Sequence, residues 1–163
     1  MKKIIIAIML ILPMAISAQK FGHINTQELF VQMPEMAQVK LKMDTIQSQY
    51  ESQFTMMYEE LQKKLQDYQA QEATMADAIK QIRQQELQEM QQRIQLFNQT
   101  AEQDVQRKQQ ELLTPIHEKM AKAIKAVGER EEYTYIFDSA AMVHVGADAK
   151  DLMPAVKAEL GIK

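Results

Sequence analysis

Residues 50–69 read YESQFTMMYEELQKKLQDYQ and contain three tyrosines, one phenylalanine and two adjacent methionines. The stretch has no glycine or proline, and its apolar residues recur every three or four positions, a spacing that favours an α-helix. A helix that packs along a single partner needs only a narrow apolar stripe. This stretch holds more large apolar side chains than such a stripe requires, which raises the question of what the additional ones face.

The apolar positions in and around this stretch repeat every eleven residues. From Met43 to Tyr68 they are separated by steps of 3, 4, 4, 3, 4, 4 and 3 residues. An eleven-residue repeat corresponds to about 3.67 residues per turn, so helices that pack along it run nearly straight or twist slightly to the right. The predicted seam of this helix is Val39, Met43, Ile46, Tyr50, Phe54, Met57, Leu61, Leu65 and Tyr68.

The same repeat continues after residue 76. One apolar row is Ile79, Met90, Ala101, Leu112 and Ala123, and a second is Ile94, Val105, Ile116 and Val127. A third row, Phe97, Lys108 and Lys119, loses its apolar character. The second half of the pattern therefore predicts another long helix that packs along the first.

The two helices are predicted to form a hairpin arm over residues 35–131, with the chain reversing near 73–76. The outgoing helix would span 35–73, about 58 Å at 1.5 Å per residue, and the return helix would begin at Met75. Thr74 and Asp77 are spaced as in a capping box, in which the threonine hydroxyl accepts from the Asp77 amide. No glycine marks the reversal, so one continuous helix is the alternative.

Pro115 lies inside the predicted return helix. Leu112 and Ile116 keep the apolar phase across it, so we expect a kink rather than the end of the helix. Proline removes one backbone hydrogen bond and clashes with the carbonyl of the residue four positions earlier, here Glu111. Pro115 is therefore a candidate hinge of the arm.

Residues 19–34 and 132–163 are predicted to form a β-rich head with short helices. The predicted strands are Lys20–Asn25, Tyr133–Asp138 and Ala141–Gly146, with the last two joined as a hairpin through Asp138–Ala140. These 48 residues bury little surface, and three strands leave open edges. We therefore expect oligomerisation to complete the head.

Two helices complete the predicted head. A short helix follows the first strand and ends before Pro34, because proline cannot continue it. The last helix is predicted to start at Asp148 and to stop at Gly161, with Leu152, Val156 and Leu160 on one face.

Residues 1–18 have the layout of a secretory signal peptide. Lys2 and Lys3 precede the apolar run Ile4–Leu12, and small residues lead to a predicted cleavage site at Ala18–Gln19. We therefore expect an exported protein, either periplasmic or secreted. Without Lys2 and Lys3 the chain has 17 basic and 22 acidic residues, a net charge of −5, which argues against nucleic-acid binding.

The sequence contains no catalytic or metal-binding motif, so we expect no enzyme activity, metal or other cofactor. Cysteine is absent from the whole chain, and no glycine-rich loop could hold the phosphates of ATP. His117 precedes Glu118, but no second histidine follows at the helical spacing of a zinc site. A weaker alternative is an envelope enzyme that uses His23, Asp138 and Ser139.

The surplus apolar residues flank the predicted seam. Met56 and Tyr58 lie on either side of Met57, and five residues widen the stripe of the return helix: Ile82, Leu87, Leu96, Leu113 and Ile124. They could thicken the seam or contact another subunit. They could also form a wide, weakly specific binding surface, a role that suits methionine because its side chain is flexible and polarizable.

The sequences KFGHINTQELF (20–30) and YTYIFDSAAMVHVGADAKDLMPAVKAELG (133–161), on either side of a long hairpin rich in Gln, Lys, Glu and Met, resemble the Skp/OmpH family. This resemblance implies a mainly α protein with a small β head, assembled as a jellyfish-shaped homotrimer with a β-barrel-like body. It also implies a periplasmic holdase chaperone that encloses unfolded outer-membrane β-barrel proteins without ATP. The client-binding residues would then be Met56, Tyr58, Ile82, Leu87 and Leu96.

The charge of the arm departs from this family. Its best-known members are strongly basic, with cationic arm tips that are linked to lipopolysaccharide and anionic lipid. Residues 61–100 here contain five basic and five acidic side chains, so we do not extend lipid binding to this chain. The alternative from another functional class is a structural coiled-coil spacer or adaptor of the cell envelope, which would bind no client.

Overall fold

The computed structural model describes residues 19–162, so the predicted signal peptide lies outside the described residues. The described chain forms two compact units, one over residues 28–122 and the other over residues 19–27 and 123–161. We call the first the hairpin unit and the second the head unit. The elements in chain order are β1 (Phe21–Ile24), α2 (Thr26–Val31), α3 (Glu35–Gln71), the 3₁₀ turn η1 (Glu72–Thr74), α4 (Asp77–Arg130), β2 (Tyr135–Asp138), the 3₁₀ turn η2 (Ser139–Ala141), β3 (Lys150–Asp151) and α5 (Met153–Leu160).

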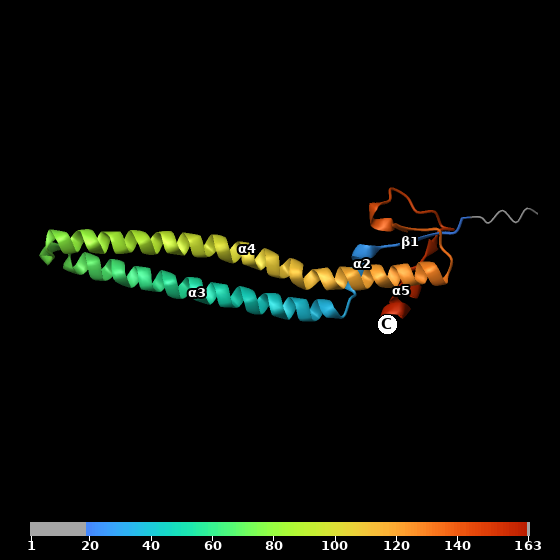
Figure 1. The fold of residues 1–163 in the computed structure, drawn as a ribbon, viewed down its shortest axis with the longest axis horizontal. Helices are drawn as coiled ribbons and strands as arrows, with labels where there is room; N and C mark the ends of the chain where they lie inside the picture. Colours follow the sequence, from blue (N-terminus) through green and yellow to red (C-terminus); the bar gives the residue numbers. More distant parts are fainter. Residues whose placement is uncertain (1–18, 163) are drawn as a thin grey trace, which may run out of the picture. The chain divides into compact units, whose positions relative to one another are not determined.

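The helices α3 and α4 run side by side in opposite directions, as Figure 1 shows. All nine predicted seam positions of α3 are buried or half-buried, which confirms the eleven-residue pattern. Near the far end of the hairpin, Leu61 packs with Met90 and Ile94 in a buried cluster. The hairpin is therefore held together by the repeat that the sequence predicts.

The first turn of α4 departs from the predicted seam. Ile79 was expected to face α3, but its side chain is exposed. Tyr68, close to the end of α3, meets Gln84, which lies more than one turn beyond Ile79. α4 therefore begins before it comes alongside α3, and Ile79 has no part of α3 to cover it.

The chain reverses through η1 and Met75, which rules out one continuous helix. Met75 has an extended backbone (φ −75°, ψ 141°), so α4 begins at Asp77 rather than at Met75. The predicted capping box is wrong. The Thr74 hydroxyl donates to the Gln71 carbonyl at 3.0 Å and thus closes the end of the 3₁₀ turn.

α4 continues through Pro115, as the apolar phase predicts. In Figure 1 the helix changes direction along its yellow-to-orange part. Beyond the end of the α3 seam, α2 packs on α4 through Phe30 and His117, whose rings stack with centroids 4.6 Å apart. α2 therefore covers α4 where it extends past the start of α3.

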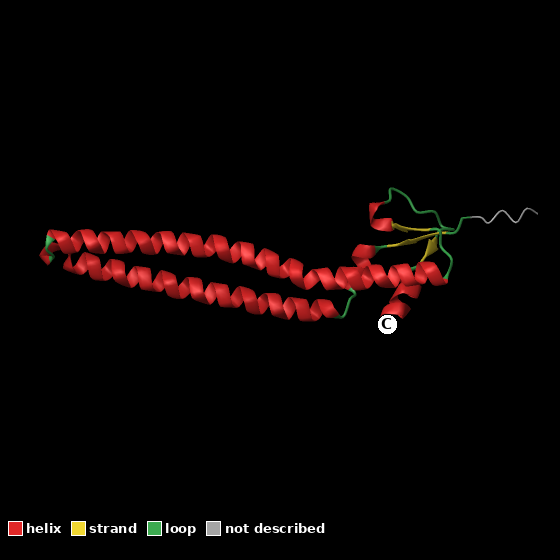
Figure 2. Ribbon diagram, viewed as in Figure 1, coloured by secondary structure: helices red, strands yellow, loops and turns green. Residues whose placement is uncertain are grey.

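The head unit contains a three-stranded sheet in the order β2-β1-β3, drawn in yellow in Figure 2. Both neighbours run parallel to β1, and Phe21 is paired with Tyr135. The predicted hairpin of residues 133–146 is wrong, because β2 pairs with β1 and not with residues 141–146. The Asp138 carboxylate accepts from the Ala140 amide, which turns the chain into η2, and residues 141–146 form no strand.

The core of the head unit lies between the sheet and two helices. Ile24, Val127, Leu152 and Val156 are fully buried or nearly so. Gly22 allows this close packing, since a Cβ atom there would lie 2.8 Å from Leu152 Cδ1. Side chains from β1, α4 and the last helix therefore meet in one small core.

The last helix, α5, starts later than predicted. Its first amide, at Met153, donates to the Asp151 carboxylate at 2.8 Å, so Asp151 rather than Asp148 marks its start. Gly161 ends the helix with φ +72°, a left-handed conformation that glycine adopts without strain. The predicted stop is thus confirmed.

Candidate functional site

Four of the five predicted client-binding residues stand exposed on the hairpin unit. We call them the outer apolar residues, and their exposed fractions are 53% for Met56, 48% for Tyr58, 54% for Ile82 and 62% for Leu96. Leu87, the fifth, is half-buried against the cluster of Leu61, Met90 and Ile94. The structure therefore places Leu87 in the hairpin packing and leaves the other four available to a partner.

One of the outer apolar residues, Tyr58, is supported by a seam residue beneath it. The ring of Tyr58 stacks on that of Phe54, with centroids 6.1 Å apart, and Phe54 itself packs against the buried cluster. A large apolar side chain that is held in place loses little further conformational freedom when a partner covers it. Tyr58 is thus well suited to weak, non-directional contacts.

Further apolar side chains of the hairpin unit are also exposed, and the sequence pattern alone does not single them out. Leu41 lies between the seam positions Val39 and Met43, yet it points outward. With Ile46 and Leu112 it lines a groove of about 420 Å³. Leu41 and Ile79 extend the exposed apolar surface towards both ends of α3.

The middle of the hairpin is less tightly packed than its far end. Tyr50 and Phe97 meet with ring centroids 6.0 Å apart, and the Tyr50 hydroxyl donates to Asp104 at 2.6 Å. Both rings line two grooves: one of about 540 Å³ that includes Phe54, and another of about 330 Å³ that includes Lys108. We call these the Phe54 groove and the Lys108 groove.

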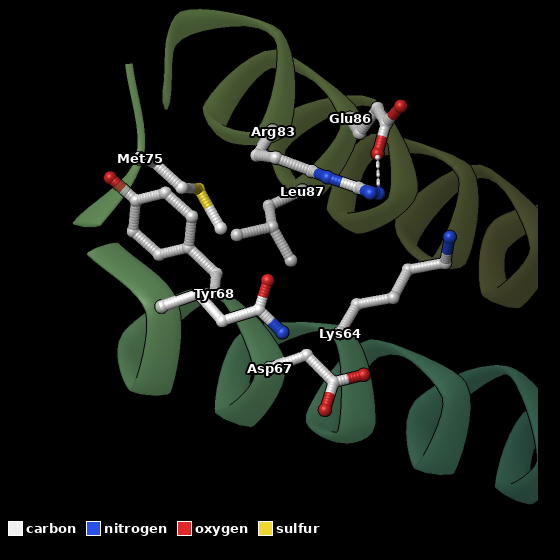
Figure 3. A pocket seen from close by; sticks show the side chains of 8 residues that line it. Lys64, Asp67, Tyr68, Met75, Arg83, Glu86 and Leu87 are labelled. Atoms are coloured by element: carbon white, nitrogen blue, oxygen red, sulfur yellow. Dashed lines mark hydrogen bonds and ion pairs between the residues drawn. The ribbon is translucent and has the colours of Figure 1, made fainter. Parts of the chain in front are cut away.

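A small cavity of about 120 Å³ lies near the end of the hairpin, between α3 and the start of α4 (Figure 3). Two basic and two acidic side chains line it: Lys64, Arg83, Asp67 and Glu86. The Arg83 guanidinium donates to Glu86 at 3.0 Å. Because the lining charges balance, this cavity offers no net positive field that would attract an anion.

Tyr68 joins the two helices beside this cavity. Its hydroxyl accepts from the Gln84 side chain at 2.8 Å and donates to Glu72 at 3.0 Å. Burial raises the pKa of this phenol further above neutral pH, where the hydroxyl already holds the proton that it donates to Glu72. Tyr68 therefore closes the seam at the end of the hairpin.

The residues of the enzyme alternative do not form a catalytic arrangement. The Asp138 carboxylate accepts from the Thr26 hydroxyl at 2.5 Å and from the Ala140 amide at 3.0 Å, and it makes no bond to His23. His23 Nδ1 is buried, and it has no hydrogen-bond partner among the residues that the structure describes. Over residues 19–162 no three His, Asp or Glu side chains could hold a metal ion together, and no helix is long and apolar enough to cross a bilayer.

Lowering the pH below about 4 is expected to destabilise the head unit through Asp138. The hydrogen bond from the Thr26 hydroxyl, with further bonds from the Ala140 and Thr26 amides, holds the pKa of this carboxyl below its ordinary value despite burial, which raises it. A carboxyl whose pKa is lower in the folded state stabilises the fold above its unfolded pKa, and this contribution is lost as the pH falls through the folded pKa.

Urea denaturation at a series of pH values measures this effect. Asp138→Asn should be less stable at neutral pH and should lack this part of the pH dependence. A variant with the same pH profile as the original protein would contradict the role of Asp138.

An exposed aromatic face on the head unit was not predicted as a site. Phe21, Tyr135 and Phe137 stand exposed on one side of the sheet, and their neighbouring rings lie 6.0–6.1 Å apart. The alternation of residues along a strand puts Tyr135 and Phe137 on the same face. Their pairing with Phe21 depends on the parallel register, which the sequence pattern alone does not give.

Comparison with known proteins identifies the family. The model of the OmpH-like outer membrane proteins matches residues 20–160. The chaperone protein Skp of Pectobacterium atrosepticum is 29% identical over 136 residues, which cover 83% of this chain and 82% of that protein. A solved structure of an OmpH-like outer membrane chaperone from Caulobacter crescentus shares the fold, with a TM-score of 0.77 and 19% identity over 87% of this chain and 83% of that one. The chain therefore belongs to the OmpH-like outer membrane protein family, to which the Skp chaperones are related.

Proposed function

We propose that this Skp/OmpH-like chaperone is an ATP-independent holdase that encloses unfolded outer-membrane β-barrel proteins in the periplasm and keeps them from aggregating. The observation that carries the proposal is the exposure of the outer apolar residues on a hairpin whose seam is complete without them. Many weak apolar contacts need no particular client sequence, because the hydrophobic effect is non-directional. Such contacts suit clients that are unfolded and varied.

We infer that the working form is a homotrimer assembled through the head unit. β2 and β3 lie at the edges of the sheet, and the aromatic face of Phe21, Tyr135 and Phe137 is uncovered. Exposed edges and aromatic patches are features that a subunit contact would cover. Light scattering should give the mass of three chains, and a monomer at micromolar concentration would contradict this assembly.

The decisive experiment dilutes a urea-unfolded outer-membrane β-barrel protein into buffer with the processed chaperone and without ATP. We expect the client to stay soluble at one trimer per client, and turbidity and sedimentation measure the result. Failure to keep the client soluble at every ratio would reject the holdase function. It would leave the spacer or adaptor as the remaining function for the hairpin.

Pro115 is proposed as a hinge that lets the hairpins of the assembly open around clients of different size. Pro115→Ala restores the missing hydrogen bond to Glu111, a change of about 3 kcal/mol in helix propensity, and should narrow this movement. Because the chain has no cysteine, Ala73→Cys provides one spin-label site on each hairpin. Distances between labels should then spread less in the Pro115→Ala protein, and fewer large clients should be kept soluble. Equal distance distributions in both proteins would rule out the hinge.

A further inference from the structure

The charged side chains in the middle of the hairpin are all acidic. Residues 43–62 on α3 and 94–106 on α4 contain no lysine or arginine, and their acidic residues are Asp44, Glu51, Glu59, Glu60, Glu102 and Asp104. Three of the outer apolar residues, Met56, Tyr58 and Leu96, lie in these same segments. A client that reaches this apolar surface therefore meets a negative field.

The Phe54 groove combines the acidic charge with an aromatic lining. Tyr50, Phe54 and Phe97 contribute rings, and the charged residues of the lining are Glu51 and Glu102, which are both exposed. Within residues 19–162 neither carboxylate forms an ion pair. Glu51 accepts only a neutral hydrogen bond, from Gln47 at 3.1 Å. Both charges are thus available to a cation brought by a partner.

The Lys108 groove on the other side of the Tyr50–Phe97 contact differs in charge. It is lined by Asp104 and Lys108, one of each sign. Asp104 already accepts from Tyr50 and pairs with Arg107, and the Lys108 amine donates to Glu111 at 3.1 Å. The charges of the Lys108 groove are therefore paired within the chain. The negative field that could select a partner comes from the Phe54 groove.

We infer that the Phe54 groove binds apolar segments of unfolded clients that carry lysine or arginine beside their apolar residues. This inference rests on the proposed holdase function and names the client segments that its surface prefers. The long stem of a lysine or arginine can lie on the aromatic lining while its charge reaches Glu51 or Glu102. A segment that carries glutamate in the same place is repelled, so the groove separates segments of equal hydrophobicity by charge.

Two short synthetic peptides test the inference. They share the same Leu, Val and Tyr residues, and they differ only in flanking lysines or flanking glutamates. Fluorescence anisotropy with the assembled protein should show the lysine peptide binding about three- to tenfold more tightly at low salt, the effect of two exposed ion pairs. The preference should disappear near 1 M salt, where the screening length is about 3 Å. Equal affinity of the two peptides at low salt would overturn the inference.

A matched pair of double variants locates the effect. Glu51→Gln with Glu102→Gln should remove the preference for the lysine peptide. Glu89→Gln with Glu118→Gln makes the same change in net charge elsewhere on α4, and Glu89 accepts from Gln85 as Glu51 does from Gln47. We expect this second variant to keep the preference. Equal losses in the two variants would mean that overall charge, not the groove, selects the peptide.

The client assay separates this inference from the proposed function. If the original protein keeps an unfolded client soluble but binds both peptides equally, the groove has no charge preference and the holdase function stands. If it binds neither peptide and does not protect the client, both proposals fail together.

Discussion

Replacement of Met56, Tyr58, Ile82 and Leu96 by glutamine should abolish protection of an unfolded client while leaving the hairpin folded. Each of these side chains is about half exposed, so each loses apolar contact with a client but little contact within the chain. At about 25 cal/mol per Å² of apolar surface covered, each contributes roughly 1 kcal/mol to binding. Together the four replacements should weaken client binding by about two to three orders of magnitude.

Client solubility after dilution from urea and the melting curve by circular dichroism measure the two halves of this prediction. A control variant carries Met142→Gln and Val143→Gln, which change exposed apolar residues of the head unit. It should protect the client as well as the original protein does. A four-site variant with full protection would show that the outer apolar residues do not bind clients, and an unfolded one would show that they stabilise the hairpin.

Leu87→Gln should behave differently from the four outer replacements. Leu87 packs against the cluster around Leu61, so a polar side chain there should lower the melting temperature of the hairpin. Its effect on clients would then follow from lost structure rather than from a lost contact.

Leu152→Ala should lower the free energy of unfolding of the head unit by about 2–5 kcal/mol. Leu152 is fully buried, and it lies against Gly22, where a Cβ atom would approach its Cδ1 to 2.8 Å. Its amide also donates to the His23 carbonyl at 2.9 Å, which connects the start of α5 to β1. The small core of the head has few other large side chains that could fill the cavity left by alanine.

Urea denaturation and light scattering together test this prediction, because the proposed homotrimer depends on a folded head. Leu152→Met keeps most of the volume and should cost less than about 1.5 kcal/mol. The alanine variant should lose the assembled form at concentrations where the methionine variant keeps it. Equal stability of the two variants would mean that the space around Leu152 collapses without cost.

The hairpin could be predicted from the sequence because its contacts repeat along the chain. A seam residue on α3 recurs with the helical period, so each position supports the next one. Leu87 also follows this rule: it lies three residues before Met90 and seven before Ile94, on the face that packs. The structure agrees with this spacing, because Leu87 is half-buried there.

The head could be predicted only in part, because its pairing is not local. The strand-like composition of residues 141–146 suggested a hairpin, whereas β1 pairs in parallel with residues far along the chain. The aromatic face has the same origin, since Phe21 meets Tyr135 only through that register. The Phe54 groove likewise needs α3 and α4 side by side before Glu51 and Glu102 share one lining.

The order of the sheet also has a consequence for how the chain folds. β1 is the central strand, yet Thr26 and Asp138, which bond at the end of the β1–β2 pair, are 112 residues apart in the sequence. A flexible loop of that length resists closure, at a cost that grows with the logarithm of its length. The two helices of the hairpin can pair first, starting near the reversal, where facing residues are close in sequence. Their pairing shortens the flexible chain that separates the strands. During synthesis, therefore, β1 has to wait for nearly the whole chain before it finds its partners, and a prematurely terminated product would keep the outer apolar residues but lack the sheet.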